Sequence, residues 1–158
     1  MLVPVNISRL LIREMADSQF VTLQEIDGSR SFPIAIGLSE AFAIERRMNG
    51  AVPPRPQTHD LLDALLSSMG AKLERIEIHD LDSGTFHARL VLEHEGRSIS
   101  VDSRPSDALA LGVAKDTPIY VENSVMEEAG SLAPDDGGGL PESSGFEEDL
   151  DEDDSEFQ

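Results

Sequence analysis

The segment Ile99–Tyr120 has the sequence ISVDSRPSDALALGVAKDTPIY and contains a strand, a helix and a second strand in close succession. The β-branched start predicts a strand, the alanine- and leucine-rich centre predicts a helix, and Pro118 leads into a second apolar strand. The residue before a proline avoids the α region, so we expect Arg104 to be the last non-helical residue and Pro105 the first helical one. The junction of strand and helix should therefore lie at Asp102–Pro105.

This junction carries more polar side chains than a simple connection needs. Asp107 falls in the first helical turn, near the positive end of the helix dipole, and Asp102 closes the strand. Both carboxylates and the Arg104 guanidinium are therefore expected to converge at one end of the helix. A purely structural interpretation stays open, in which Asp107 is a dipole partner and Arg104 is its ion-pair companion.

Length and composition indicate a single domain with its own core. The chain has 158 residues and no cysteine, which excludes disulfides and thiolate metal sites. The N-terminus lacks the basic segment followed by an apolar run that is typical of a signal peptide. No apolar segment approaches the length of a membrane span. We therefore expect a soluble, cytoplasmic protein that does not bind membranes.

The formal net charge of −19 is divided between a domain at residues 1–130 and a tail at residues 131–158. The tail contains eleven acidic residues and no Lys or Arg, which leaves 20 acids against 12 bases in the domain. With few apolar residues, the tail is predicted to be disordered. We interpret it as a solubilising segment, with a self-inhibiting phosphate mimic as the alternative. Bulk charge does not favour passive nucleic-acid binding, which depends on neutralising phosphates.

An internal repeat organises the domain. A shift of 67 positions aligns Arg30–Phe32 with Arg97–Ile99, and Ser39–Ile44 with Ser106–Leu111 without a gap. Each half also begins with two predicted strands. The predicted fold is therefore α+β, a duplicated β-β-β-α unit with a mixed or antiparallel sheet and packed helices.

The repeat separates shared residues from unshared ones. Glu40 and Asp107 are equivalent, as expected for acids in a first helical turn. Asp102 and Arg104 have no polar counterpart in the first half. The second half therefore carries chemistry that the scaffold alone does not require.

Three local predictions concern helix faces and strand register. The helix at 39–48 should carry Ala41, Ile44 and Met48 on one face. Thr58 should cap the connecting helix, which has a broad apolar stripe. The hairpin of residues 72–93 should close with a three-residue loop in which Leu81 pairs with Thr85. The stripe comprises Leu61, Leu62, Leu65, Leu66 and Met69, and the hairpin register pairs Ile76 with Leu90, Glu77 with Arg89, Ile78 with Ala88 and His79 with His87.

That hairpin register places Arg75, His79, His87 and Arg89 on one polar face. We interpret this face as an ordinary solvated sheet surface, because antiparallel sheets often keep one face wet. A metal or phosphate site is the alternative.

The segment Arg55–Asp60, RPQTHD, places an imidazole and a carboxylate at a helix N-terminus beside an arginine. Helix N-termini favour anions, so phosphate could dock here or at the helix after Arg104. Together these segments supply the parts of a phosphodiesterase, although a lone His after an N-cap threonine is more often a partly exposed surface residue. The candidate catalytic residues are His59, Asp60, Asp102, Arg104 and Asp107; the substrate-binding residues are Arg55, Arg104 and Ser106; and the ligands for Mg²⁺ or Mn²⁺ are Asp60, Asp102 and Asp107.

Three motifs together resemble the bifunctional nuclease domain family: RPQTHD at 55–60, GTF at 84–86 and VDSRPSDA at 101–108. The likeness covers roughly residues 2–130 and leaves the acidic tail outside. It implies a compact α+β domain that often self-associates, and the family name implies hydrolysis of DNA and RNA.

Two hypotheses for the function follow. The first is a nuclease that cleaves phosphodiester bonds in nucleic acids with the help of a divalent metal. The second is a non-catalytic, oligomeric binding or regulatory module in which Arg104 and Asp107 form a structural ion pair. The acidic composition of the domain favours the second hypothesis, because little basic surface is available to follow a phosphate backbone.

Overall fold

The computed structural model describes residues 1–132, and the predicted acidic tail lies almost entirely outside the described residues. The strands are β1 (Leu2–Leu11), β2 (Gln19–Glu25), β3 (Ser31–Ile36), β4 (Lys72–Asp82), β5 (Thr85–His94), β6 (Arg97–Ser103) and β7 (Ile119–Glu122). The helices are α1 (Leu38–Met48), α2 (Thr58–Ser68), α3 (Pro105–Gly112), the short 3₁₀ helix η1 (Val113–Lys115) and α4 (Asn123–Leu132).

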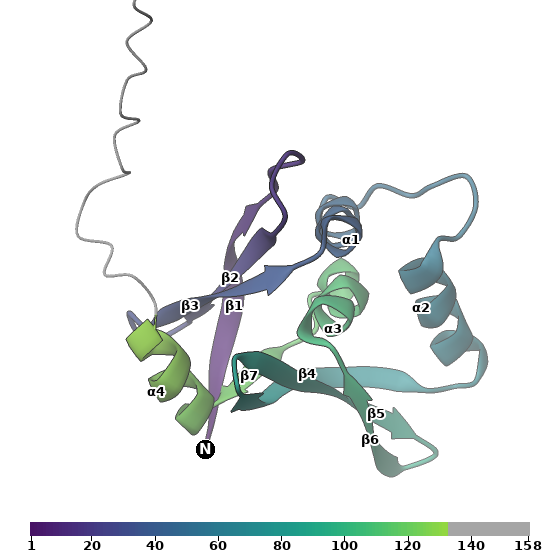
Figure 1. The fold of residues 1–158 in the computed structure, drawn as a ribbon. Coiled ribbons are helices and arrows are strands. Elements are labelled where there is room, and N and C mark those ends of the chain that lie inside the picture. Colours follow the sequence, from purple (N-terminus) through teal and green to yellow (C-terminus); the bar gives the residue numbers. More distant parts are fainter. Residues whose placement is uncertain (133–158) are drawn as a thin grey trace, which may run out of the picture.

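The seven strands form one mixed sheet in the order β3-β2-β1-β7-β4-β5-β6 (Figure 1). Only β4 and β7 run parallel, and the other neighbours are antiparallel. The units β1-β2-β3-α1 and β4-β5-β6-α3 lie on opposite sides of β7. The predicted α+β fold with a duplicated β-β-β-α unit is confirmed.

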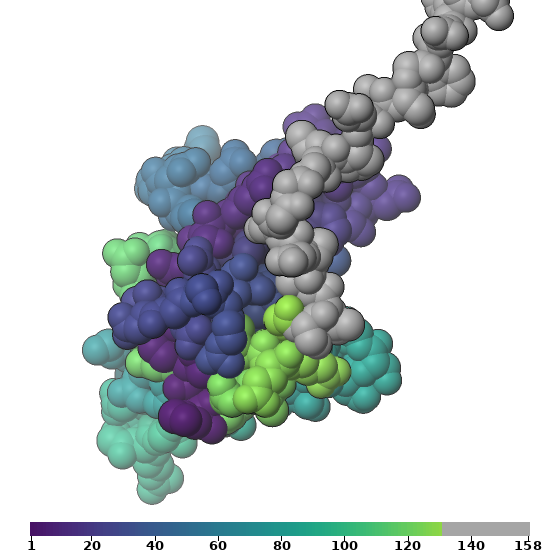
Figure 2. All heavy atoms as spheres, turned by 90° about the vertical axis from the view of Figure 1, so that its left-hand side faces the viewer, coloured from purple at the N-terminus to yellow at the C-terminus, as the bar shows by residue number. Residues whose placement is uncertain are grey.

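The core lies between the sheet and helices α1, α3 and α4. Helices α1 and α3 pack against each other, and α4 packs against β3 and β4 (Figure 1). In the space-filling view α4 lies against the blue β3 segment (Figure 2). The largest fully buried apolar side chains are Phe32, Leu23, Ile44, Ile76, Ile78, Leu109 and Met126.

Helix α3 is the central helix of the molecule. Every residue of α3 is buried except Asp107. A helix with neighbours on all sides must be apolar around its whole circumference and small where the neighbours come close, which explains its alanines and leucines. Asp107 is the only charged residue of this helix and the only one that is not buried.

The predicted cap of α2 is wrong, and the apolar faces of α1 and α2 are only partly buried. In α1, Ala41 and Ile44 are buried but Met48 is exposed. Arg47 is buried as well, because its guanidinium reaches polar partners on α2 and α3. In α2, Gln57 is the N-cap and forms a capping box with Asp60, so Thr58 is the first helical residue. The apolar stripe of α2 is split: Leu62 and Leu66 pack against the core, whereas Leu61, Leu65 and Met69 are exposed.

The β4–β5 register is partly as predicted. Ile76 pairs with Leu90, Glu77 with Arg89 and Ile78 with Ala88. The turn is different: Asp82 pairs with Thr85, and both Ser83 and Gly84 have positive φ. Such a two-residue turn matches the twist of the strands, and a bulge between Ile78 and Asp80 accommodates the extra residue. His87 consequently pairs with Asp80, and its predicted pairing with His79 is wrong.

Within residues 1–132, no helix is long and apolar enough to span a membrane.

Candidate functional site

The N-terminal ends of α2 and α3 meet through a histidine–carboxylate contact. His59, the second residue of α2, places its Nε2 atom 3.0 Å from Oδ1 of Asp107, in the first turn of α3. The His59 side chain is 13% exposed and that of Asp107 is 35% exposed. Two segments separated by nearly 50 residues thus share one polar contact at the protein surface.

Arg104 extends this contact to a third helix. Its Nε atom donates to Asp107 Oδ2 at 2.9 Å, and its Nη2 atom donates to Oε1 of Glu40 at 3.0 Å. Glu40 lies in the first turn of α1 and is the repeat counterpart of Asp107. Arg104, which has no counterpart in the first half of the repeat, therefore bonds to the two acids that occupy equivalent positions in the two halves. We call Glu40, His59, Arg104 and Asp107 the junction cluster.

The charge states of the residues in the junction cluster determine which atoms donate hydrogen bonds and which accept them. Burial acts to raise the pKa of Asp107, but hydrogen bonds from Arg104 and His59 outweigh it and hold this pKa below its ordinary value. The same contacts with Asp107 and Glu40 raise the pKa of Arg104. An ionised carboxylate can only accept, so Nε2 of His59 carries the proton. In the neutral ring Nδ1 is then the basic nitrogen.

A surface hollow of about 590 Å³ borders the junction cluster on the side of β3. Its wall includes Arg104, Ser106, Gly37 and Phe86, and Phe86 stacks on the buried Phe32 with ring centroids 5.3 Å apart. The described residues of α2, including His59, do not contribute to this wall.

Ser106 brings an unused hydroxyl to the hollow. Its side chain and backbone together are only 6% exposed, and within residues 1–132 its hydroxyl makes no hydrogen bond. No side chain caps the start of α3, and the first N–H groups of a helix lack partners inside it. With the Arg104 guanidinium, these donors form an arrangement suited to an anion.

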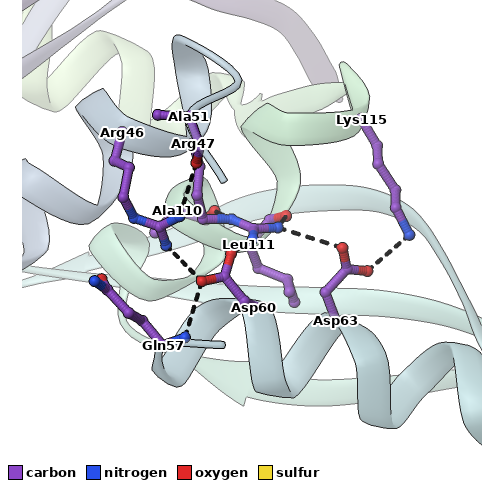
Figure 3. A network of polar contacts seen from close by, with 9 residues as sticks. All are labelled: Arg46, Arg47, Ala51, Gln57, Asp60, Asp63, Ala110, Leu111 and Lys115. Atoms are coloured by element: carbon purple, nitrogen blue, oxygen red, sulfur yellow. Dashed lines mark hydrogen bonds and ion pairs between the residues drawn. The ribbon is translucent and has the colours of Figure 1, made fainter. Parts of the chain in front are cut away.

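Asp60, although adjacent to His59, belongs to a different cluster (Figure 3). It accepts hydrogen bonds from Arg46 Nη2 at 2.7 Å, from Arg47 Nη1 and from the backbone N–H of Gln57 at 3.0 Å. Burial acts to raise the pKa of Asp60, but these bonds outweigh it and lower the pKa. The contacts give Asp60 a clear structural role, which is to hold α2 against α1.

The structure places the two remaining predicted residues apart from the junction cluster. Asp102 is exposed on β6, where it pairs in register with Arg89, and Arg104 contacts Glu40 and Asp107 instead of it. Arg55 is exposed in the connection before α2. Neither makes a side-chain hydrogen bond or ion pair to another residue of the range 1–132. The structure thus brings His59, Arg104 and Asp107 of the predicted site together and places Asp60 and Asp102 elsewhere, so the expected convergence of Asp102 with Arg104 and Asp107 is wrong.

The predicted metal ligands do not form a shared site. Asp60 is bound by Arg46 and Arg47, Asp107 is bound by Arg104 and His59, and Asp102 lies on strand β6. Across the described range 1–132, no group of three or more His, Asp and Glu side chains is arranged to hold a metal ion. These carboxylates therefore do not fit a common Mg²⁺ or Mn²⁺ ion in this arrangement.

Sequence reasoning missed two residues. The position of Glu40 in the site could have been predicted from the sequence, since the repeat makes Glu40 equivalent to Asp107. Nothing in the sequence indicates the burial of Arg47, because a basic residue in the last turn of a helix is usually an exposed partner of the helix dipole.

Comparison with known proteins shows the family of this chain. The family model of the bifunctional nuclease domain matches residues 21–133, and this chain belongs to that family. The matched range contains all four residues of the junction cluster.

Individual relatives fall into two groups. The uncharacterized protein Rv1829 of Mycobacterium tuberculosis is 40% identical over 131 residues, which are 83% of this chain and 78% of the relative. Bifunctional nuclease 1 of Oryza sativa subsp. japonica and the bifunctional nuclease of Oryza minuta are each 24% identical over 125 residues, 77% of this chain and 38% of the plant protein. This chain therefore corresponds to less than half of each plant nuclease.

Proposed function

We propose that this protein is a nuclease that hydrolyses phosphodiester bonds in DNA and RNA at the junction cluster. The observation that carries the proposal is the contact of His59 with Asp107, whose second oxygen is bound by Arg104 beside an open hollow. Membership of the bifunctional nuclease domain family supports the same class of reaction.

Each residue has a defined task in this proposal. Arg104, the Ser106 hydroxyl and the free N–H groups at the start of α3 hold the phosphate oxygens. Water attacks phosphorus and gives a proton to Nδ1 of His59, the bond from phosphorus to the leaving oxygen breaks, and His59 then delivers that proton to the leaving oxygen. Asp107 orients the ring through Nε2 during both transfers. Glu40 positions Arg104, and Arg55 contacts the nucleic-acid backbone before α2.

We propose to test whether cleavage requires a divalent metal ion. Asp60, Asp102 and Asp107 do not share a site, so none of the tasks above depends on Mg²⁺ or Mn²⁺. We also propose that the protein acts in the cytoplasm and self-associates.

The non-catalytic alternative predicts a different environment for the cluster. A purely structural ion pair of Arg104 with Asp107 would be expected in a buried position away from any hollow. The Arg104 side chain is instead 64% exposed and borders the hollow. This exposure favours a ligand-binding role.

The test is cleavage of single- and double-stranded DNA and RNA by the full chain, with EDTA, Mg²⁺ or Mn²⁺. His59→Asn and Arg104→Gln are compared with the matched controls His94→Asn and Arg97→Gln, which pair with each other at the far end of β5 and β6 from the cluster. We expect cleavage by the wild type and both controls, and at least tenfold less by the two cluster variants. Absence of cleavage by the wild type, or equal cleavage by all five proteins, overturns the proposal.

A further inference from the structure

Strand β6 is an open edge of the sheet. All of its residues are exposed except the partly buried Ser103. Its pairing with β5 runs from Arg97 to Ser103 without a bulge, so the opposite side presents a regular row of backbone N–H and C=O groups. Proteins usually protect such edges with proline, charged side chains or a bulge. Strand β6 has no proline and no bulge, and its two charged residues, Arg97 and Asp102, lie near its ends.

The other edge of the sheet is protected. Strand β3 has Pro33 near its centre, where the missing N–H interrupts a row of donors. The two edges therefore differ in their ability to accept another strand, and β6 is the edge suited to it.

The exposed face of β6 is also apolar. Ile99 and Val101 are 40% and 41% exposed, and they pair in register with the buried Leu92 and Leu90. Ile99 and Val101 thus extend a row of buried apolar side chains to the edge strand of the sheet, where no other described residue covers them. A strand added to β6 would cover both side chains.

The sequence of β6 is complementary to itself. If two copies pair antiparallel about Ser100, Ile99 of each copy lies opposite Val101 of the other, and Ser100 lies opposite Ser100. Asp102 then lies opposite Ser98, and Arg97 lies opposite Ser103, so no like charges face each other. This register uses all seven residues of β6. A shift of one residue along either strand moves apolar side chains to opposite faces.

We propose that β6 pairs antiparallel with β6 of a second copy, with a two-fold axis at Ser100, so that one sheet runs through both copies. Self-complementarity favours a second copy over an unrelated strand, because a two-fold interface requires each residue to match its own symmetry partner. The proposal names the surface for the self-association proposed above and does not depend on hydrolytic activity.

A single introduced cysteine tests the register, because the natural chain contains none. Residues directly opposite in an antiparallel pair have Cα atoms roughly 4.5–5.5 Å apart, within the range that a disulfide spans. Ser100→Cys should therefore form a disulfide-linked dimer of the full chain under mild oxidation. Ser98→Cys is the matched control, since its symmetry mates lie about 14 Å apart along the strands.

A second experiment tests the surface without cross-linking. The mass of the full chain in solution is measured by light scattering across a concentration series. Wild type should dimerise, and Ile99→Lys with Val101→Lys should remain monomeric. Val52→Lys is the control, because Val52 is 90% exposed in the connection before α2 and far from β6 in the sequence. Circular dichroism verifies that each variant is folded.

Each outcome is decisive. Selective cross-linking at residue 100, with loss of the dimer in the β6 lysine variant alone, supports the proposal. A wild type that stays monomeric, or equal cross-linking at residues 98 and 100, overturns it. A wild-type dimer that does not cross-link at residue 100 overturns the β6 interface while leaving self-association intact.

Discussion

Arg47 is the residue that fastens α2 to the rest of the domain. Its Nε atom donates to the carbonyl of Ala110 at 2.6 Å and its Nη2 atom to that of Leu111 at 3.2 Å, near the C-terminal end of α3. The same guanidinium pairs with Asp60 and Asp63 on α2 (Figure 3). Helix α2 has no fully buried residue of its own, so its position, and with it that of His59, depends on these polar contacts as well as on the partly buried Leu62 and Leu66.

Replacing Arg47 with alanine should destabilise the protein strongly. The change leaves two carbonyls and Asp60 without the buried partner that they share, and breaking a buried ion pair costs about 3–5 kcal/mol. Urea unfolding measures the loss. Arg55→Ala, at an exposed position without described contacts, should change the free energy of unfolding by less than about 0.5 kcal/mol. Similar losses in the two variants would contradict the role of Arg47.

Glu77 gives the stability of the protein a specific pH dependence. Burial acts to raise the pKa of its carboxyl, but hydrogen bonds from Arg75 and Arg89 outweigh it and hold the pKa below the ordinary value of 4.5. The ionised form is therefore favoured by folding. Its stabilisation is complete above the unfolded pKa and is lost as the pH falls through the lower, folded pKa.

In Glu77→Gln this contribution is absent. The melting temperature of the variant should therefore fall less steeply than that of the wild type as the pH is lowered from about 5, because its amide does not titrate. Thermal unfolding followed by circular dichroism at a series of pH values measures both slopes. Parallel curves for the two proteins would contradict the assignment.

Gly112, the last residue of α3, lies close to Ile76 of strand β4. A Cβ atom at this position would lie 2.6 Å from Cδ1 of Ile76 and 3.1 Å from Cβ of Thr117. The backbone of Gly112 has a negative φ of −83°, so close packing explains the glycine and backbone conformation does not.

Gly112→Ala should therefore destabilise the protein by about 1–3 kcal/mol, the usual cost of forcing extra volume into a packed core. Gly130→Ala in α4 is the matched control, since no atom lies within 4 Å of its Cβ position. That control should be neutral or stabilising by up to about 1 kcal/mol, because alanine favours helix. Chemical denaturation of both variants makes the comparison, and a neutral Gly112→Ala would refute the packing argument.

The elements of this fold were largely predictable because local patterns and the repeat agree with each other. The alignment of Ser39–Ile44 with Ser106–Leu111 correctly placed α1 and α3. The hairpin turn was not predictable in the same way, because a two-residue turn with a bulge at His79 and a three-residue loop without one leave the same apolar pairs around Glu77. Only the backbone geometry distinguishes them.

The part of the site that the sequence indicates is the part that lies at the N-terminal ends of helices. His59 and Asp107 lie in the first turns of α2 and α3, and Arg104 is the N-cap of α3. The three residues come together because α2 packs on α3. The partners of Asp60 were not predictable, because they depend on the burial of Arg47 through contacts across three helices. Sequence spacing places side chains on a helix but does not say which neighbouring helix they face.

The whole molecule combines an acidic domain with a more acidic tail. Truncation after residue 132 removes eleven acidic residues and no basic ones. Repulsion of a nucleic acid should fall, so we expect tighter binding of a labelled single-stranded oligonucleotide at low salt and a difference that vanishes at high salt. Fluorescence polarisation measures both conditions. Equal affinity of the two proteins at low salt would contradict this role of the tail charge.

The central claim is that His59 and Asp107 act as one catalytic unit, and a double-mutant cycle of single-turnover cleavage rates tests it most directly. His59→Asn should slow cleavage by roughly 100- to 10,000-fold, the usual contribution of a general acid or base. Asp107→Asn should slow it through loss of ring orientation, and the double variant should be no slower than His59→Asn alone, because residues acting as a unit are non-additive. Rates that multiply independently, or a His59→Asn variant as fast as the wild type, would contradict the account.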